Sequence, residues 1–298
     1  MNQSSLCFPD GQKSCFRCCP PVRAPGYDHY PHRLFLAREL RDNTSRYDPA
    51  DFSLKPITGF NCWALGYLDR KFKLVGCLLH PVQNGGRDLR GRIDYGHKCA
   101  REFCQEASIF DQLTADHRQF WLGLAEALDS FQYSSNLINP MFRVLNFGPG
   151  VLSAVAAHSG PESMADRELI STYPFLSMAA WPRSCAFLVE QIISGYGVPF
   201  LAGPEGLELI NGLMNHLQTS LAAFLSPKRS SGRPYVHQLS LDRSLADFFR
   251  FGLNVSCLSQ TEADTLGLQV RRLTAEWLSL PSNEQQVKSN EQPIMSNE

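Results

Sequence analysis

The distribution of cysteine along the chain is the feature that most constrains its fold. Of ten cysteines, eight fall within residues 1–104, at positions 7, 15, 18, 19, 62, 77, 99 and 104. In an oxidising compartment such clustering would indicate disulfides, whereas in a reducing one thiolate ligands to a metal explain it better. The N-terminus has no apolar segment of the kind that a secretory signal needs. We therefore expect a cytoplasmic protein whose N-terminal region binds metal.

The charges divide along the chain in the same way. Residues 1–104 contain 16 Lys and Arg against 10 Asp and Glu, a balance of +6, and the formal net charge of the whole chain is −1. Basic surroundings would make it easier to hold several thiolates together around a zinc ion, although a solvated basic surface is an equally simple interpretation. With a total charge close to zero, nothing global favours nucleic acid or an acidic membrane surface. No apolar stretch is long enough to predict a transmembrane helix.

The first region is predicted to combine one short helix with a β-hairpin. After Pro31, the apolar residues Leu34, Ala37 and Leu40 recur at helical spacing within residues 28–43. Residues 60–79 contain two short apolar runs around a polar turn, which predicts two strands.

The register of this hairpin depends on its loop. If the loop has two residues, Asp69 and Arg70, then Cys62 lies directly across from Cys77, with Cβ atoms about 4.5–5.5 Å apart. That spacing suits two ligands of one metal ion. A four-residue loop would shift the register.

Helical patterning dominates after Cys104. Thr114 is a candidate N-cap, Pro204 is placed to open a second helix, and a third helix is expected from about Glu262 to Leu280. Shorter helical pieces are expected within residues 137–158, 164–196 and 240–252.

These patterns predict a mainly α fold. We expect a small, irregular, metal-stabilised N-terminal domain that contains the β-hairpin, followed by an all-α helical domain. The predicted divisions are a cysteine-cluster metal-binding domain at 1–106, a helical domain at 107–280 and a disordered polar tail at 281–298.

The cysteines differ in how well their spacing suits metal ligation. Cys15 and Cys18 form a C-x-x-C pair, whose spacing lets two sulfurs reach one ion from a tight turn. Because adjacent side chains usually point apart, Cys18 and Cys19 could serve different metals, or one of them could be a packed core thiol. The four best candidates are Cys15, Cys18, Cys77 and Cys99. Cys19, Cys62 and Cys104 are possible further ligands of the same site or of a second site. Zinc and an iron–sulfur cluster are both compatible with such a set.

Two details of spacing limit the ligand set. Cys99 and Cys104 are five residues apart, which on a continuous helix separates them by about 140°. Both can bind one ion only if a helix begins or ends between them. His80 and His97 each lie near a cysteine and could complete a mixed site, but a histidine before a proline is better explained as a hydrogen-bonding residue.

The remaining three cysteines are weaker candidates. Cys7 lies in a polar N-terminal arm. Cys185 and Cys257 are most simply explained as buried core thiols on helices, because they are far from the cluster and lie in the region of helical patterning.

The cysteine motifs resemble the YkgJ-type cysteine-cluster family, described as a zinc- or iron-chelating domain. The resemblance is carried by CFRCCPP, by the segment from Gly76 to Pro81, and by Cys99 and Cys104. The family shows a run close to C-x-x-C-x-x-C-C, whereas here one cysteine is displaced to Cys7 or absent, and 21 residues separate Cys77 from Cys99. The resemblance covers about the first third of the chain. It implies metal or iron–sulfur binding without an assigned reaction.

Motifs of the common enzyme classes are missing from the sequence. It contains no G-x-G-x-x-G, P-loop, H-E-x-x-H, G-x-S-x-G, EF-hand loop or radical-SAM C-x-x-x-C-x-x-C. A basic stretch from Arg87 to Arg101 is interleaved with Asp88 and Asp94, which favours a salt-bridged loop over a nucleic-acid surface. We therefore predict neither a nucleic-acid nor a membrane partner, and the identity of any protein or small-molecule partner stays open.

Three functional hypotheses remain. The first is a metal-binding protein in which zinc or an iron–sulfur cluster contributes folding energy to the N-terminal domain. The second is a metal- or cluster-dependent redox enzyme with an open coordination position. The third is a cytosolic thiol redox sensor, in which Cys18 and Cys19 would need depressed thiol pKa values. We adopt the first hypothesis.

Overall fold

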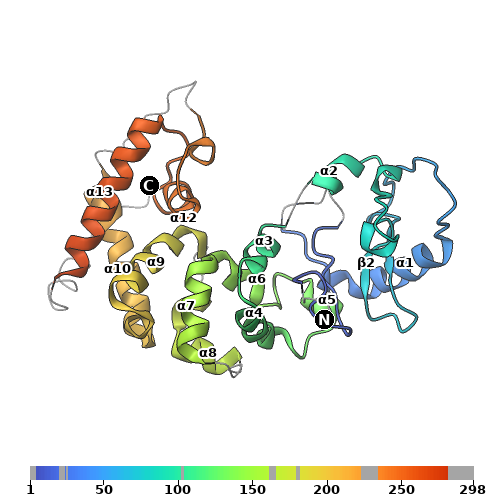
Figure 1. Ribbon diagram of the computed structural model, residues 1–298, viewed down its shortest axis with the longest axis horizontal. Coiled ribbons are helices and arrows are strands. Elements are labelled where there is room, and N and C mark those ends of the chain that lie inside the picture. Colours follow the sequence, from blue (N-terminus) through green and yellow to red (C-terminus); the bar gives the residue numbers. More distant parts are fainter. Residues whose placement is uncertain are drawn as a thin grey trace, which may run out of the picture. The chain divides into compact units, whose positions relative to one another are not determined.

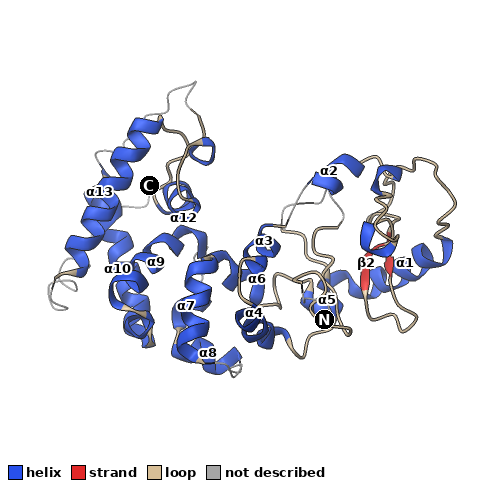
Figure 2. Ribbon diagram, in the orientation of Figure 1, coloured by secondary structure: helices blue, strands red, loops and turns tan. Residues whose placement is uncertain are grey.

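The computed structural model (Figure 1) describes residues 5–19, 24, 26–101, 104–160, 166–178, 182–222 and 234–280. The chain divides into two compact units, Met1–Phe142 and Arg143–Glu298. Helices make up most of the regular structure, and within the described ranges the only sheet is a two-stranded hairpin (Figure 2). The predicted mainly α fold with a small β-hairpin is therefore confirmed. The tail predicted at 281–298 lies outside the described residues.

The first unit is organised around one helix and the hairpin. Helix α1 (Arg33–Arg46) packs against strand β1 (Leu65–Tyr67), which pairs antiparallel with β2 (Val75–Cys77). The predicted helix is confirmed, but its apolar face is only partly as expected. Leu36 and Leu40 are buried, whereas Leu34 is 83% exposed.

The predicted register of the hairpin is wrong. Leu65, and not Cys62, lies opposite Cys77. The cause is the loop, in which the Asp69 carboxylate accepts hydrogen bonds from backbone N–H groups. The donors are Lys71 at 3.1 Å, Lys73 at 2.9 Å and Leu74 at 2.7 Å. An Asp side chain that bonds its own loop backbone stabilises a turn longer than two residues.

Short helices follow the hairpin within the first unit. They are α2 (Gly96–Arg101), α3 (Gln105–Asp111), α4 (Ala115–Leu122) and α5 (Ser130–Tyr133). Thr114 caps α4 as predicted, since its side chain accepts a hydrogen bond from the His117 N–H at 3.2 Å. Helix α6 (Met141–Val144) lies where the first unit ends.

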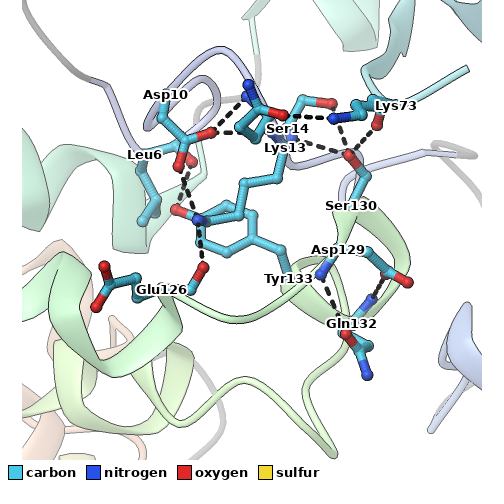
Figure 3. Close-up of polar contacts among 11 residues, drawn as sticks. Leu6, Asp10, Lys13, Ser14, Lys73, Glu126, Asp129, Ser130, Gln132 and Tyr133 are labelled. Atoms are coloured by element: carbon cyan, nitrogen blue, oxygen red, sulfur yellow. Dashed lines mark hydrogen bonds and ion pairs between the residues drawn. The ribbon is translucent and has the colours of Figure 1, made fainter. Parts of the chain in front are cut away.

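The arm of residues 5–19, which carries the first four cysteines, is tied to α5 and to the hairpin. The Ser14 N–H donates to Ser130 Oγ at 3.0 Å, and the Ser130 hydroxyl donates to the Lys73 carbonyl (Figure 3). The Ser14 hydroxyl donates to the Val75 carbonyl at 2.8 Å and accepts from the Val75 N–H at 2.7 Å. These bonds explain why the first unit extends beyond residue 106, where the sequence analysis placed a boundary.

The described regular structure of the second unit is helical, apart from an isolated β-bridge between Tyr235 and Cys257. Its helices are α7 (Pro149–Ser159), α8 (Asp166–Thr172), α9 (Ala186–Tyr196), α10 (Gly203–Ser220), α12 (Arg243–Asp247) and α13 (Gln260–Leu278). Helix α9 packs against α7, α10 and α13, and α10 also packs against α13. Pro204 lies in the first turn of α10, as predicted. Among the described helices, none is both long and apolar enough to cross a membrane.

Candidate metal centre

None of the ten cysteines forms a disulfide bond, and they differ in exposure. Cys62 and Cys185 are buried, Cys7 and Cys18 are exposed, and the other six are half-buried. The eight cysteines of residues 7–104 all belong to the first unit. For description we divide them into the arm set (Cys15 with its electrostatic neighbours Cys7, Cys18 and Cys104) and the core set (Cys62 of the hydrophobic core, with Cys19, Cys77 and Cys99 packed against that core).

The arm set is centred on Cys15. The Cys15 N–H donates to the Cys7 carbonyl at 2.9 Å, which holds the two ends of the arm's loop together. Burial raises the pKa of the Cys15 thiol well above its ordinary value. The charges of three other thiols raise it further, those of Cys7, Cys18 and Cys104. Burial of the Cys7 thiol, and then the charge of Cys18, raise its pKa to about 11, although the residue as a whole is exposed.

Cys104 joins the arm set from the beginning of α3. Its thiol donates to Glu106 Oε2 at 3.1 Å, and the other carboxylate oxygen of Glu106 pairs with the Arg17 guanidinium at 3.1 Å. Burial and the charge of Glu106 raise the pKa of Cys104 to about 12. Arg17 lies in the turn between Cys15 and Cys18, so this ion pair connects α3 to the C-x-x-C turn.

The core set packs against the hydrophobic core of the first unit. Cys62 is 3% exposed and belongs to that core, and the partly buried Cys19, Cys77 and Cys99 pack against it. Burial raises the pKa of Cys62 to about 11 and that of Cys77 to about 12. The charge of Cys99 raises both values further. A side-chain hydrogen bond between Cys19 and Cys18, then burial, raise the pKa of Cys19 well above its ordinary value, with Cys77 and Cys62 as further neighbours.

The hairpin and α2 position the core set. Cys77 ends β2, and Cys62 precedes β1, where its carbonyl accepts the Leu65 N–H at 3.0 Å. Cys99 lies in α2, and its carbonyl accepts from Arg90 Nη1 at 2.7 Å. The first residue of α2 must be Gly96, because a Cβ there would collide with the Arg90 carbonyl.

The four cysteines that the sequence marks as the best ligand candidates do not fall in one set. Cys15 and Cys18 lie in the arm set, whereas Cys77 and Cys99 lie in the core set. Cys7, the weakest of the eight candidates, is an immediate neighbour of Cys15. Its position depends on contacts of the arm with residues far along the chain, and no local pattern signals them.

The condition under which Cys99 and Cys104 could bind one ion, a helix end between them, is met. Helix α2 ends at Arg101 and α3 begins at Gln105. Cys104 is an electrostatic neighbour of Cys15, and Cys99 is one of Cys77.

The other candidate residues have structural contacts. His80 Nδ1 accepts a hydrogen bond from the Val82 N–H at 3.2 Å, as expected of a histidine before a proline. Cys185 is fully buried, and its thiol donates to the Pro182 carbonyl at 3.3 Å just before α9. The expectation that Cys257 is a buried thiol on a helix is wrong, because it is half-buried and forms an isolated β-bridge with Tyr235.

The basic residues after the hairpin make ionic, hydrogen-bonding and cation–π contacts within the first unit. Arg90 forms an ion pair with Asp88 at 2.8 Å. Arg92 is buried, donates to the Pro49 carbonyl at 2.9 Å and lies over the Phe52 ring. These contacts are those of a salt-bridged loop.

In the arrangement that the structure shows, no three Cys, His, Asp or Glu side chains of the described residues are placed to hold one metal ion. Binding would therefore require thiols of a set to change rotamer about χ1, and staggered alternatives exist for such a side chain. The donor chemistry fits a soft metal, because each set offers four sulfurs. Ligation would also reverse the raised pKa values, since a coordinating thiol is deprotonated by its metal.

Comparison with known proteins finds no match for this chain. The chain matches no protein-family model, no curated protein and no solved structure. The similarity to the YkgJ-type family consequently stays a prediction carried by the cysteine motifs alone.

Proposed function

We propose that the first unit is a metal-binding module whose cysteines hold zinc or an iron–sulfur cluster. The observation that supports the proposal is that eight cysteines, from the arm, the hairpin, α2 and the start of α3, belong to the first unit, where Cys15 and Cys77 each have other thiols as electrostatic neighbours. Four sulfur ligands are what a structural zinc ion takes, and what an iron–sulfur cluster takes.

The fold of the first unit provides a reason for such a module. Its strands are three residues long, and α2, α3 and α5 have at most seven residues. Elements this short contribute little stability by themselves. Metal bound by side chains that are far apart in sequence would contribute folding energy directly. A zinc ion would act structurally in a closed four-cysteine site, whereas a cluster would also supply electron transfer.

The thiol-sensor hypothesis is less well supported by the same thiols. A reactive cysteine needs a lowered pKa, because the thiolate is the nucleophile. The pKa of Cys19, one of the two residues that this hypothesis needs, is raised instead by its hydrogen bond with Cys18 and by burial. The redox-enzyme hypothesis requires either a cluster that transfers electrons or a metal with an open coordination position, and the experiment below distinguishes an iron–sulfur cluster from zinc.

The experiment is metal and acid-labile sulfide analysis, with an absorption spectrum, of the full chain expressed in a reducing cytoplasm and purified without oxygen. Iron with sulfide and visible absorption would identify a cluster and lead to a search for redox partners. Zinc without colour would identify structural sites. A metal-free chain would contradict the proposal and make the thiol switch the leading hypothesis.

A matched pair of variants tests the assignment to the first unit. We expect Cys18→Ala to lower the metal content and to unfold the N-terminal region, and Cys257→Ala to do neither. Cys257 is a suitable control because it lies in the second unit and in neither set. Equal metal content in the two variants would contradict the assignment.

A further inference from the structure

We infer that Glu190 of α9 is a proton-binding site: its carboxyl group keeps a proton in the folded chain and donates it to the hydroxyl of Ser244 in α12. Both residues belong to the second unit. The inference is therefore independent of the proposed metal-binding function. Its consequence is a contact between two helices that depends on pH.

The first argument is a count of the hydrogens around Ser244. Ser244 Oγ lies 2.7 Å from Glu190 Oε2 and 2.6 Å from Asp242 Oδ1. Both separations are those of O–H···O hydrogen bonds, and each bond needs a hydrogen between its two oxygens. A serine hydroxyl has one hydrogen to donate, and an ionised carboxylate has none. One of the two carboxyl groups must therefore supply the second hydrogen.

The second argument excludes Asp242 as the source of that hydrogen. Asp242 Oδ1 also accepts from the backbone N–H groups of Ser244 at 2.9 Å and Leu245 at 3.3 Å, as an ionised N-cap residue does. Burial acts to raise the pKa of Asp242, but its hydrogen bonds with Ser244 and Leu245 outweigh burial and lower the pKa. The Ser244 hydroxyl therefore donates to Asp242. The hydrogen between Ser244 and Glu190 then belongs to Glu190.

The third argument is the electrostatic environment of Glu190. Burial raises the pKa of its carboxyl group above the ordinary value. The negative charge of Asp242, just before α12, acts in the same direction. A hydrogen bond donated by Ser244 would act against this shift, as does the positive charge of Arg271 on α13. The balance favours the neutral acid.

The two oxygens of the Glu190 carboxyl group also have different surroundings. Oε1 lies beside the start of α7, 3.5 Å from the position of a Cβ on Gly148 and 3.6 Å from one on Gly150. The first backbone N–H groups of a helix carry positive partial charge, which suits an accepting oxygen. The basic residue of α7, His158, lies in its last turn. A neutral acid has one carbonyl oxygen and one hydroxyl, so Oε1 fits the acceptor and Oε2 the donor.

Loss of the proton should weaken the contact between α9 and α12. With Glu190 ionised, Ser244 has one hydrogen for two carboxylates, so one short contact becomes repulsive. Helix α12 also carries the buried Asp247, which pairs with Arg183 at 2.5 Å and with His237 at 2.8 Å. The folded chain keeps the proton at pH values where the unfolded chain has lost it. The stability of the second unit should therefore fall as pH rises above 4.5, the ordinary pKa of glutamate, and level off above the folded-state pKa.

The test titrates Glu190 in the full chain by carbon NMR of the glutamate side chains, with Glu190→Gln to assign its signal. We expect a titration midpoint above 4.5. Asp242→Asn should lower that midpoint, because the new amide can donate to Ser244 and leaves the Ser244 hydroxyl free to donate to Glu190. A wild-type midpoint at or below 4.5 would overturn the inference.

Unfolding of the second unit provides an independent readout. Glu190→Gln keeps a donor for Ser244 and does not titrate. Between pH 4.5 and the folded-state pKa, the ratio of the unfolding equilibrium constants of the wild-type chain and this variant should therefore rise about tenfold per pH unit. Amide hydrogen exchange in α9 and α10, corrected for the intrinsic effect of pH on exchange, measures this ratio.

A matched control is available on α10. Glu208 is exposed there, so Glu208→Gln should follow the wild-type chain at every pH. Circular dichroism shows that each variant is folded. If Glu190→Gln and the wild-type chain respond to pH in the same way, Glu190 does not hold the proton and the inference fails.

Discussion

The two units of this protein bury their residues in different ways. The second unit packs long helices around large apolar side chains, including Phe187 and Phe248, which are almost completely buried, and Trp277, which is 1% exposed. The first unit has shorter elements, and side-chain hydroxyls hold its arm in place. Most of its cysteines lie in or beside its core or its arm. The contrast indicates that a unit with little regular structure depends more on polar bonds and, in our proposal, on metal.

Metal removal should have the largest effect and should act on the first unit alone. Structural zinc binding contributes about 10–16 kcal/mol at pH 7, which is comparable to the whole stability of a domain, about 5–15 kcal/mol. Treatment of the full chain with a chelator under reducing conditions should therefore abolish amide hydrogen-exchange protection in α1 and the hairpin, and leave α10 and α13 protected. Equal loss of protection in both units would remove the distinction between them.

Truncation of a core side chain in the second unit should destabilise that unit and leave metal binding by the first unit unchanged. Leu266 on α13 is completely buried, so Leu266→Ala should lower the free energy of unfolding by about 2–5 kcal/mol. The metal content of the chain should not change. Leu268→Ala on the same helix is the matched control, since Leu268 is 71% exposed and its truncation should change stability by less than about 0.5 kcal/mol. Urea unfolding measures both, and similar losses in the two variants would contradict the packing described for α13.

The hydroxyl that connects the arm to α5 should have an intermediate effect. Ser130 is 4% exposed, accepts from the Ser14 N–H and donates to the Lys73 carbonyl. Ser130→Ala leaves both partners without that hydroxyl, which should cost about 1–3 kcal/mol in the first unit. Hydrogen exchange of the first unit measures the loss. Ser108→Ala, at an exposed position of α3, is the control, and an equal effect there would show that the Ser130 bonds contribute nothing.

The N-cap of α13 should have the smallest effect. The Ser259 hydroxyl accepts from the Glu262 N–H, and the Glu262 side chain accepts from the Ser259 N–H at 3.0 Å. Ser259→Ala should lower the stability of the second unit by about 1 kcal/mol, and Ser259→Gly by only a few tenths. Thermal unfolding resolves the two, and an alanine variant as stable as the wild type would show that the capping box is not needed.

Local patterns were sufficient to predict much of the fold. The helices after Thr114 and Pro204 begin where the sequence places them, because capping and the conformational limits of proline act over a few residues. The hairpin is present as predicted, but its predicted register is wrong. The Asp69 carboxylate accepts hydrogen bonds from three backbone N–H groups of the loop. A register predicted from loop length alone does not account for these bonds.

The candidate site shows the same limit more clearly. Clustering and C-x-x-C spacing predict seven cysteines of the first unit as ligands, with Cys7 the weakest of the eight candidates, and ligation itself stays a prediction. The spacing did not reveal which cysteines lie together. Cys15 and Cys77 were expected in one site, and they lie in different sets.

The sequence by itself determined the mainly α class, the presence of a hairpin and the chain segments that carry thiols, because these depend on periodicity, turn chemistry and composition. Only the tertiary structure decided how the thiols are divided. The arm is held by bonds between residues more than 100 positions apart, such as Ser14 with Ser130. Contacts over such distances depend on how the whole unit packs, and no local pattern in the sequence specifies them.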